Sequence, residues 1–302
     1  MESAPRPVMP AGAPVYMLAV DHRWQWEDWC DNAGVEHARI PGVKTLAADA
    51  FLDACAQDAR IASHGALLID ALYATPQVDR LMAVGATVGT PAEWPGAHPL
   101  RWQSEPMGDA LTGRFVKVLA RHRPEFAASS VREQIDRLLD LQAWCRDHAQ
   151  PLVLEVVVPR ATEPEAEFEA TGRVPIMAGY IRRAYAAGLV PDYWKLEGTT
   201  DAAAATLVDR AIAEHPSPRF LVLGKAAGMD LVERWFAAAT SMTTAAGFAI
   251  GRTVYFEPAT RWLCGELTRD AARAQMTAMY RRLVDLWEAA LARPERRIDR
   301  TA

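Results

Sequence analysis

Short apolar runs recur along the whole chain, and most of them are separated by segments with helical periodicity. Continuous runs of Val, Leu and Ile are typical of parallel strands that are covered on both faces. We interpret the following runs as strands: Tyr16–Val20, Ala66–Ile69, Met82–Val88, Phe115–Leu119, Leu152–Val157, Tyr193–Leu196, Phe220–Leu223 and Phe248–Ile250. Eight strands that alternate with helices predict an α/β fold, the (β/α)8 TIM barrel.

The connecting segments support the same fold. Long amphipathic stretches, predicted as helices, cover Lys44–Asp58, Ser129–His148, Val174–Ala187, Asp201–Glu214, Leu231–Met242 and Arg269–Ala292. The connection from the second to the third strand looks too short for a full helix. A doubly wound sheet is the alternative, but no G-x-G-x-x-G motif follows an early strand. We expect a flexible tail at 1–14, one barrel domain at 15–293 and a C-terminal tail at 294–302.

Composition excludes several classes of function. The net charge is −5 without a basic block, which argues against a nucleic-acid-binding face. No apolar run approaches membrane-spanning length and the N-terminus lacks a signal-like apolar segment, so we expect a cytoplasmic protein without membrane contact. The four cysteines and seven histidines are scattered, so no local motif predicts a metal site, and we expect no cofactor. We also expect a homo-oligomer with a small-molecule substrate.

Three charged residues interrupt strands that are otherwise apolar: Lys117, Glu155 and Lys195. Burial disfavours a charged ammonium and leaves more free amine, the form that attacks a carbonyl to make a Schiff base. A structural ion pair between Glu155 and either lysine is the alternative. Charges on several successive strands are, however, most simply explained as the lining of a polar active site.

Other polar residues stand where the predicted strands end, which is where a TIM barrel places its chemistry. These candidate substrate-binding residues are Asp21, Arg23, Asp70, Glu93, Arg121, Gly224, Lys225, Gly251 and Arg252. Asp70 could instead cap a turn or helix, and Asp21 and Arg23 could pair with each other. The loops after strands seven and eight are the usual phosphate site of this fold, so their glycines and cations predict a phosphate there. Turn glycines and solvated cations are the alternative.

Three segments carry a resemblance to a known family: Val84–Leu119, Tyr193–Glu197 and Gly247–Thr253. They resemble the 2-deoxy-5-keto-gluconate-6-phosphate aldolase-like domain of inositol catabolism. More distantly, the chain is similar to class I tagatose-bisphosphate and sulfofructose-phosphate aldolases. The resemblance covers nearly the whole chain, from about residue 16 to residue 288.

The resemblance implies a role for individual residues. Lys195 matches the Schiff-base lysine, Glu155 the acid/base carboxylate and Lys117 an active-site lysine near the reacting carbonyl. Asp21 matches a residue that contacts substrate hydroxyls, and Gly251-Arg252 the phosphate-binding pair. The chain departs from the family pattern after three strands, at Ala71-Leu72, at Arg121-His122-Arg123-Pro124-Glu125 and at Gly224-Lys225-Ala226-Ala227.

We therefore expect a class I aldolase that cleaves a phosphorylated keto-sugar or keto-sugar acid. The substrate implied is 2-deoxy-5-keto-gluconate 6-phosphate, with dihydroxyacetone phosphate and malonate semialdehyde as products. Lys117 is expected to keep Lys195 uncharged through like-charge proximity, and Arg23 or Arg121 to bind the substrate carboxylate. The alternatives are an aldolase for another phosphorylated or sulfonated ketose, and a non-catalytic sugar-phosphate-binding barrel.

Overall fold

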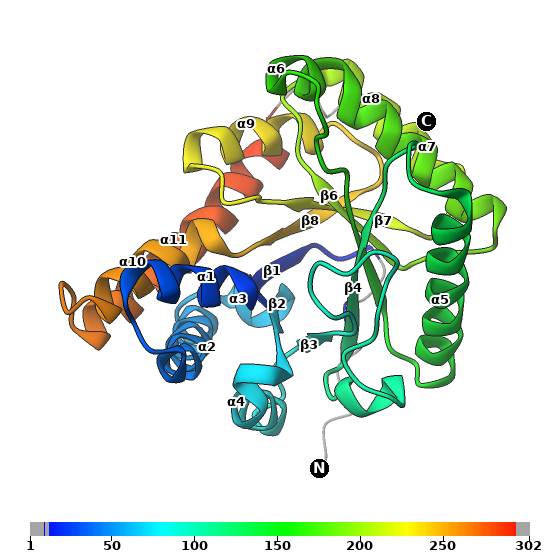
Figure 1. Ribbon diagram of the computed structural model, residues 1–302. Coiled ribbons are helices and arrows are strands. Elements are labelled where there is room, and N and C mark those ends of the chain that lie inside the picture. The colour runs from blue at the N-terminus through cyan, green and yellow to red at the C-terminus, as the bar shows by residue number, and fades with distance from the viewer. Residues whose placement is uncertain (1–8, 10–11, 294–302) are drawn as a thin grey trace, which may run out of the picture.

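The computed structural model describes residues 9 and 12–293, and this part of the chain forms a closed barrel of parallel strands in sequence order. The strands are β1 Val15–Val20, β2 Gly65–Ile69, β3 Val88–Pro91, β4 Phe115–Arg121, β5 Leu152–Val157, β6 Tyr193–Glu197, β7 Arg219–Leu223 and β8 Ala245–Ile250. Helices surround them (Figure 1). The predicted (β/α)8 TIM barrel is confirmed.

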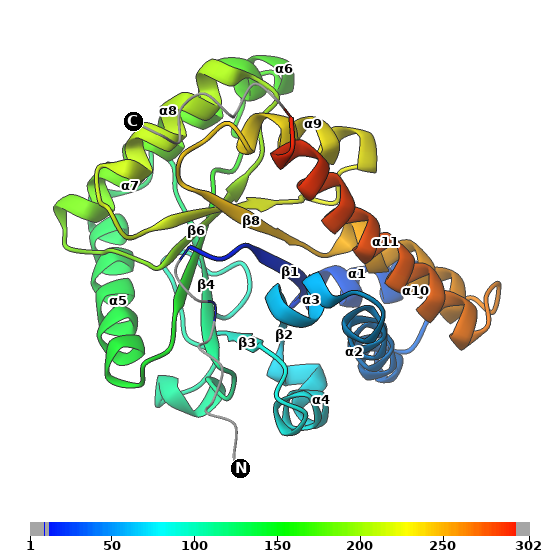
Figure 2. The same cartoon turned by 180° about the vertical axis from the view of Figure 1, so that it is seen from behind.

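The helices pack outside the barrel as two broad groups, with α5, α7 and α8 on one side and α2, α10 and α11 on the other (Figures 1 and 2). Their bounds are α1 Trp24–Ala33, α2 Ile40–Gln57, α3 Ala59–His64, α4 Ala71–Ala83, α5 Ala128–Asp147, α6 Glu165–Glu167, α7 Arg173–Ala186, α8 Ala202–Ala213, α9 Met229–Ala239, α10 Arg252–Leu263 and α11 Arg269–Leu291. Short 3-10 turns cover His37–Arg39 and Met107–Ala110, and a π turn covers Phe168–Gly172.

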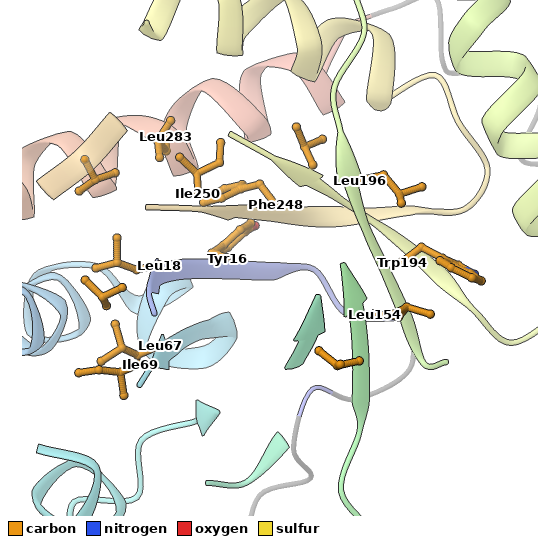
Figure 3. Close-up of a cluster of buried hydrophobic side chains, with 14 of the residues drawn as sticks. Tyr16, Leu18, Leu67, Ile69, Leu154, Trp194, Leu196, Phe248, Ile250 and Leu283 are labelled. Atoms are coloured by element: carbon orange, nitrogen blue, oxygen red, sulfur yellow. The ribbon is translucent and has the colours of Figure 1, made fainter. Parts of the chain in front are cut away.

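Alternation along the strands divides the apolar core into two layers, because successive side chains point to opposite faces of a sheet. The inner layer fills the barrel and includes Met17, Leu68, Phe115, Val153 and Tyr193. The larger outer layer lies between the strands and the helices. Figure 3 shows part of it, where Phe248 and Ile250 of β8 lie beside Leu283 of α11. Apart from the charged residues of the site, the strands are mainly apolar because both layers exclude water.

The third strand was wrongly placed by the sequence at Met82–Val88. Residues 71–83 form α4, so the connection that looked too short does hold a helix. Val84 follows that helix and is 64% exposed, and Gly85 with a left-handed φ of 77° turns the chain toward β3. The apolar run was the end of an amphipathic helix, and the true strand is only Val88–Pro91.

Most of the two expected tails, 1–8, 10–11 and 294–302, lies outside the described residues. Met9 belongs to the expected flexible tail but is buried, and its carbonyl oxygen accepts a hydrogen bond of 3.1 Å from the Tyr193 hydroxyl. Met9 therefore packs with the inner layer.

A buried ion pair between α2 and the end of β2 fixes the end of β1. The Lys44 ammonium lies 2.6 Å from Asp70 Oδ2, and both side chains are fully buried. The same ammonium donates to the carbonyl oxygens of Val20 at 2.5 Å and His22 at 2.6 Å. Asp70 also accepts from the Tyr73 backbone N–H and so caps α4. This arrangement holds the segment that follows β1 in one conformation.

We expect Asp70→Asn to lower the free energy of unfolding by about 3–5 kcal/mol, because Asn keeps the cap but leaves the Lys44 charge buried without its counter-ion. Asp201 is the matched control, since it caps the exposed start of α8 through Ala204 N–H without an ion pair. Asp201→Asn should cost less than about 1 kcal/mol. Urea unfolding measures both, and equal losses would contradict this account.

Candidate active site

A pocket of about 260 Å³ opens at the C-terminal ends of the strands. Its wall includes the barrel strands β1, β4, β5, β6, β7 and β8 and the loop that follows β3. The charged residues in the wall are Asp21, Arg23, Glu93, Lys117, Arg121, Glu155, Lys195, Glu197, Lys225 and Arg252. This is the end of a TIM barrel at which active sites lie.

Strand register brings the three interrupting charges together. Residues two apart on a strand face the same side, so Lys117, Glu155 and Lys195 continue the inner face of Phe115, Val153 and Tyr193 by one step. Glu155 pairs in register with Lys195 on β6, whereas its register partner on β4 is Leu119. The inner layer is thus apolar at one level and charged at the next.

A single carboxylate oxygen joins the two lysines. Glu155 Oε2 lies 2.9 Å from Lys195 Nζ and 3.1 Å from Lys117 Nζ. Each of the three residues is less than a tenth exposed. Both ion pairs that the sequence offered as a structural alternative are present, and the shorter one places Glu155 within direct proton-transfer distance of the Lys195 amine.

Lys117 is surrounded by carboxylates. Its ammonium lies 3.0 Å from Asp21 Oδ2 and 3.0 Å from Glu93 Oε1, in addition to Glu155. Glu93 also pairs with Arg23 at 3.3 Å, and the Arg23 guanidinium donates to Gln103 Oε1 at 2.7 Å. The alternative of an Asp21–Arg23 pair is replaced by this network, in which Asp21 and Glu93 both contact Lys117.

The charges of this network stabilise one another against burial. Burial alone would raise the carboxylate pKa values, but Lys117 and Lys195 outweigh it and hold the pKa of Glu155 below its ordinary value and that of Asp21 well below. Burial alone would lower the pKa of Lys117, but Asp21, Glu155 and Glu93 outweigh it and raise that pKa. Lys117 is therefore a fixed cation, and Asp21 and Glu155 are ionised at neutral pH.

His22 lines the pocket and was not among the predicted site residues. Tyr255 Oη lies 3.2 Å from Trp26 Nε1 and 2.9 Å from His22 Nδ1. Because an indole N–H only donates, the Tyr255 oxygen accepts from Trp26, and we assign the Tyr255 hydrogen to His22 Nδ1. Burial lowers the His22 pKa well below its ordinary value, so the ring is neutral with its proton on Nε2. The Asp21-His22-Arg23 run was the only sequence signal for it.

Lys225, in the loop after β7, was predicted to contribute to a phosphate site, with a solvated cation as the alternative. Lys225 pairs with Glu197 at 2.9 Å and Glu169 at 3.4 Å, so its charge is already compensated. Lys225 and Ala226 have left-handed φ values of 46° and 59°, a strain of about 1–3 kcal/mol each that is typical of functional loops. Arg173 binds Glu169 at 2.9 Å and Glu197 at 3.5 Å and completes this cluster.

The end of β8 meets the structural requirements of a close anion site. A Cβ on Gly251 would lie 1.7 Å from the Ala19 carbonyl oxygen, so only glycine lets β8 pass β1 this closely. Arg252 begins α10, where backbone N–H groups of the first turn are unpaired within the helix. Its Nε is buried without a hydrogen-bond partner in the described residues. Gly224 also lines the pocket, where a Cβ would lie 2.8 Å from Ile250.

The pocket brings together all but one of the predicted site residues. Asp70 does not line it, because its carboxylate is committed to Lys44 and to the start of α4. The capping alternative was therefore correct for Asp70. Lys44, its partner, lies 26 residues earlier in a helix, and no local pattern indicates the contact.

Two further observations concern the described residues alone. In that part of the chain, no three His, Cys, Asp or Glu side chains are grouped as a metal would require. Among the helices described, none combines the length and apolar character needed to cross a membrane. The expectations of a metal-free site, a cytoplasmic location and a homo-oligomer stay predictions.

Solved structures with a similar fold include aldolases. A fructose-bisphosphate aldolase from Plasmodium falciparum, in a ternary complex with TRAP and a small-molecule inhibitor, has a TM-score of 0.64 and 13% identity, over 94% of this chain and 92% of that one. A Schiff base forming fructose-1,6-bisphosphate aldolase has a TM-score of 0.55 and 16% identity, over 90% of this chain and 94% of that one. At these identities the likeness shows a shared fold.

Sequence comparison gives the family. A search of curated proteins found none that matches this chain. The profile of one protein family matches residues 9–291, nearly the whole barrel. The chain therefore belongs to the family described as "Uncharacterized protein conserved in bacteria (DUF2090)".

Proposed function

We propose that the protein is a class I aldolase that cleaves a phosphorylated ketose or keto-sugar acid through a Schiff base on Lys195. The observation that carries the proposal is the buried Lys195 amine, 2.9 Å from Glu155 in the pocket at the C-terminal end of the barrel. A lysine and a proton-transferring carboxylate are the two groups that imine chemistry needs. The shared fold of a Schiff base forming aldolase supports the proposal.

Imine formation follows from the Lys195–Glu155 contact. Glu155 removes a proton from the Lys195 ammonium, and the free amine attacks the substrate ketone to give a carbinolamine. The protonated Glu155 then returns its proton to the carbinolamine hydroxyl, which leaves as water. The nitrogen lone pair forms the C=N bond, so the product is an iminium ion and Glu155 is again a carboxylate.

Carbon–carbon cleavage then uses the iminium as an electron sink. A carboxylate, Glu155 or the neighbouring Asp21, removes the proton of the aldol hydroxyl, and the carbon–carbon electron pair moves to the iminium. This step releases an aldehyde and leaves an enamine on Lys195. Protonation of the enamine carbon and hydrolysis of the resulting imine release the second product and restore the lysine.

Lys117 acts as a fixed cation beside the reacting atoms. It was expected to keep Lys195 uncharged by repulsion, but three carboxylates surround Lys117 and one of them, Glu155, contacts both lysines. This compensation offsets the repulsion, so direct proton transfer to Glu155 becomes the route to the free amine. A charged Lys117 can also donate a hydrogen bond to the oxygen on which negative charge develops.

The end of β8 would hold the substrate phosphate. Arg252 supplies an uncompensated guanidinium, and the neutral His22 ring lies close to Gly251, since a Cβ there would be 3.1 Å from the ring. An Nε2–H donor and an arginine at one place suit a phosphate. A phosphate anchored there fixes the position of the ketone relative to Lys195, which supplies part of the catalytic gain.

The substrate proposed is 2-deoxy-5-keto-gluconate 6-phosphate, cleaved to dihydroxyacetone phosphate and malonate semialdehyde. It rests on the resemblance of Val84–Leu119, Tyr193–Glu197 and Gly247–Thr253 to that aldolase-like domain. A second candidate substrate is another phosphorylated or sulfonated ketose. Two features favour it: Lys225 is already paired with Glu197, and the Arg121-His122-Arg123 run departs from the family pattern.

A non-catalytic sugar-phosphate-binding barrel is the candidate from a different class. It is favoured by the complete pairing of Lys195 with Glu155, which a purely structural ion pair would also show. The two classes differ in one respect, because only the aldolase forms a covalent bond to Lys195.

We expect dihydroxyacetone phosphate with sodium borohydride to add one reduced adduct to the wild-type protein, at Lys195. Lys195→Arg should form none, although arginine keeps the positive charge beside Glu155 and hence the fold. Intact mass and peptide mapping measure the adduct, and circular dichroism checks the fold. No adduct on folded wild-type protein, or an adduct that persists in Lys195→Arg, would contradict the proposal.

The rate of adduct formation should fall at acid pH, and in Lys117→Met this fall (the acid limb of the pH–rate profile) should move to higher pH. Lys117 and Lys195 together outweigh burial and lower the pKa of Glu155, so removing Lys117 raises that pKa and Glu155 is protonated sooner as pH falls. Lys225→Met is the matched control, because Lys225 pairs with Glu197 and Glu169 and not with Glu155. Trapping rates with cyanoborohydride from about pH 5 to 8 measure the limb. An unchanged limb in Lys117→Met would refute this role.

A further inference from the structure

The charges of the pocket wall do not balance. Six wall residues are lysine or arginine and four are aspartate or glutamate, and His22 is neutral. One cluster is balanced internally and contains Arg23, Lys117, Lys195, Asp21, Glu93 and Glu155. Lys225 and Glu197 of the wall form a second balanced cluster with Arg173 and Glu169 behind them. An excess of two positive charges is left.

The two excess charges are Arg121 and Arg252. Among the described residues, neither guanidinium has a hydrogen bond or an ion pair, whereas every other cation of the wall contacts a carboxylate. Glu125, in the loop after β4, and Glu163, in the loop after β5, bind Arg123 at 2.9 Å and 2.6 Å instead. A bound anion can therefore compensate each of these arginines.

The barrel places these arginines across the pocket from each other. Arg121 ends β4 and Arg252 follows β8, and β4 and β8 are opposite strands in a closed barrel of eight described strands. Lys195 lies on β6, halfway between them around the barrel. All three side chains line the same pocket, so a ligand that reaches both arginines crosses the space that the Lys195 amine lines.

Arg23, the other arginine that was considered for binding a substrate carboxylate, already has protein partners. It is 3% exposed, and its two terminal nitrogens donate to Gln103 and Glu93. A second anion at Arg23 would have to share or replace the contact with Glu93, which already compensates this guanidinium. Arg121 keeps its donors free and requires no such exchange.

We propose that Arg121 binds a second anionic group of the substrate and sets its specificity. The substrate is then an open-chain molecule with one anion at Arg252, a ketone at Lys195 and a carboxylate, phosphate or sulfonate at Arg121. The ketone position rests on the proposed function, whereas the requirement for two anions rests on the charges alone. Arginine suits this task because its planar fork binds such groups through paired hydrogen bonds.

Six-carbon probes without a ketone test this independently of imine chemistry. Mannitol 1-phosphate carries one anion, mannitol 1,6-bisphosphate two phosphates, and 6-phosphogluconate a phosphate and a carboxylate. Calorimetry should show that wild-type protein binds the better two-anion probe at least about tenfold more tightly than mannitol 1-phosphate. Whichever two-anion probe binds more tightly identifies the second group as phosphate or carboxylate.

The variants assign that preference to one residue. Arg121→Gln should abolish the advantage of the two-anion probes and change mannitol 1-phosphate binding by no more than about twofold, whereas Arg121→Lys restores part of the advantage. Arg252→Gln should weaken all three probes. Arg146→Gln removes an exposed arginine of α5 that forms no ion pair, and it should change none of them.

An absent preference in the wild type, or a preference that survives in Arg121→Gln, overturns the inference. The aldolase proposal fails separately, if borohydride does not label Lys195. Loss of labelling with the Arg121-dependent preference intact would leave a binding protein for two-ended anions. Labelling without that preference would leave an aldolase whose specificity lies elsewhere.

Discussion

One oxygen of Glu155, shared by two lysine ammonium groups in the barrel interior, is the interaction on which the site depends. Removing either lysine or the carboxylate would leave a buried charge uncompensated, at a cost of about 3–5 kcal/mol. The interaction is possible because β4, β5 and β6 are in fixed register, with Lys195 directly opposite Glu155. The chemistry of the pocket is thus a direct consequence of strand pairing.

The apolar residues that fill the barrel and the charged residues of the site lie at successive levels of the same strands. Phe115, Val153 and Tyr193 fill the barrel at one level, and the charged residues begin two positions later. The Lys44–Asp70 pair is also buried but lies outside the pocket and holds the chain after β1. The buried Lys44–Asp70 pair therefore holds the backbone in place, whereas the buried Lys195–Glu155 pair is proposed to react. The two pairs differ in that only the second one lines the pocket.

The sequence predicted the barrel and the Lys117, Glu155 and Lys195 set, because charges within apolar strands are a local signal. It failed where an outcome depended on distant partners: Asp70 is held by a helix residue, and Lys225 by Glu169 and Glu197. It also misplaced the third strand, because an apolar run at the end of α4 resembles a short strand. Tyr255, whose hydroxyl contact assigns the tautomer of His22, lies 233 residues away in the sequence, so this contact could not be inferred locally.

The most direct test of the account is whether Lys195 generates an enamine. When dihydroxyacetone phosphate is incubated with the protein in D2O without an aldehyde, one of its two C3 hydrogens should exchange for deuterium. Proton NMR measures this exchange as loss of the C3 hydrogen signal. The exchange needs both the imine on Lys195 and a properly placed base, so Lys195→Arg should abolish it. No exchange by folded wild-type protein, or the same exchange by Lys195→Arg, would contradict the central claim.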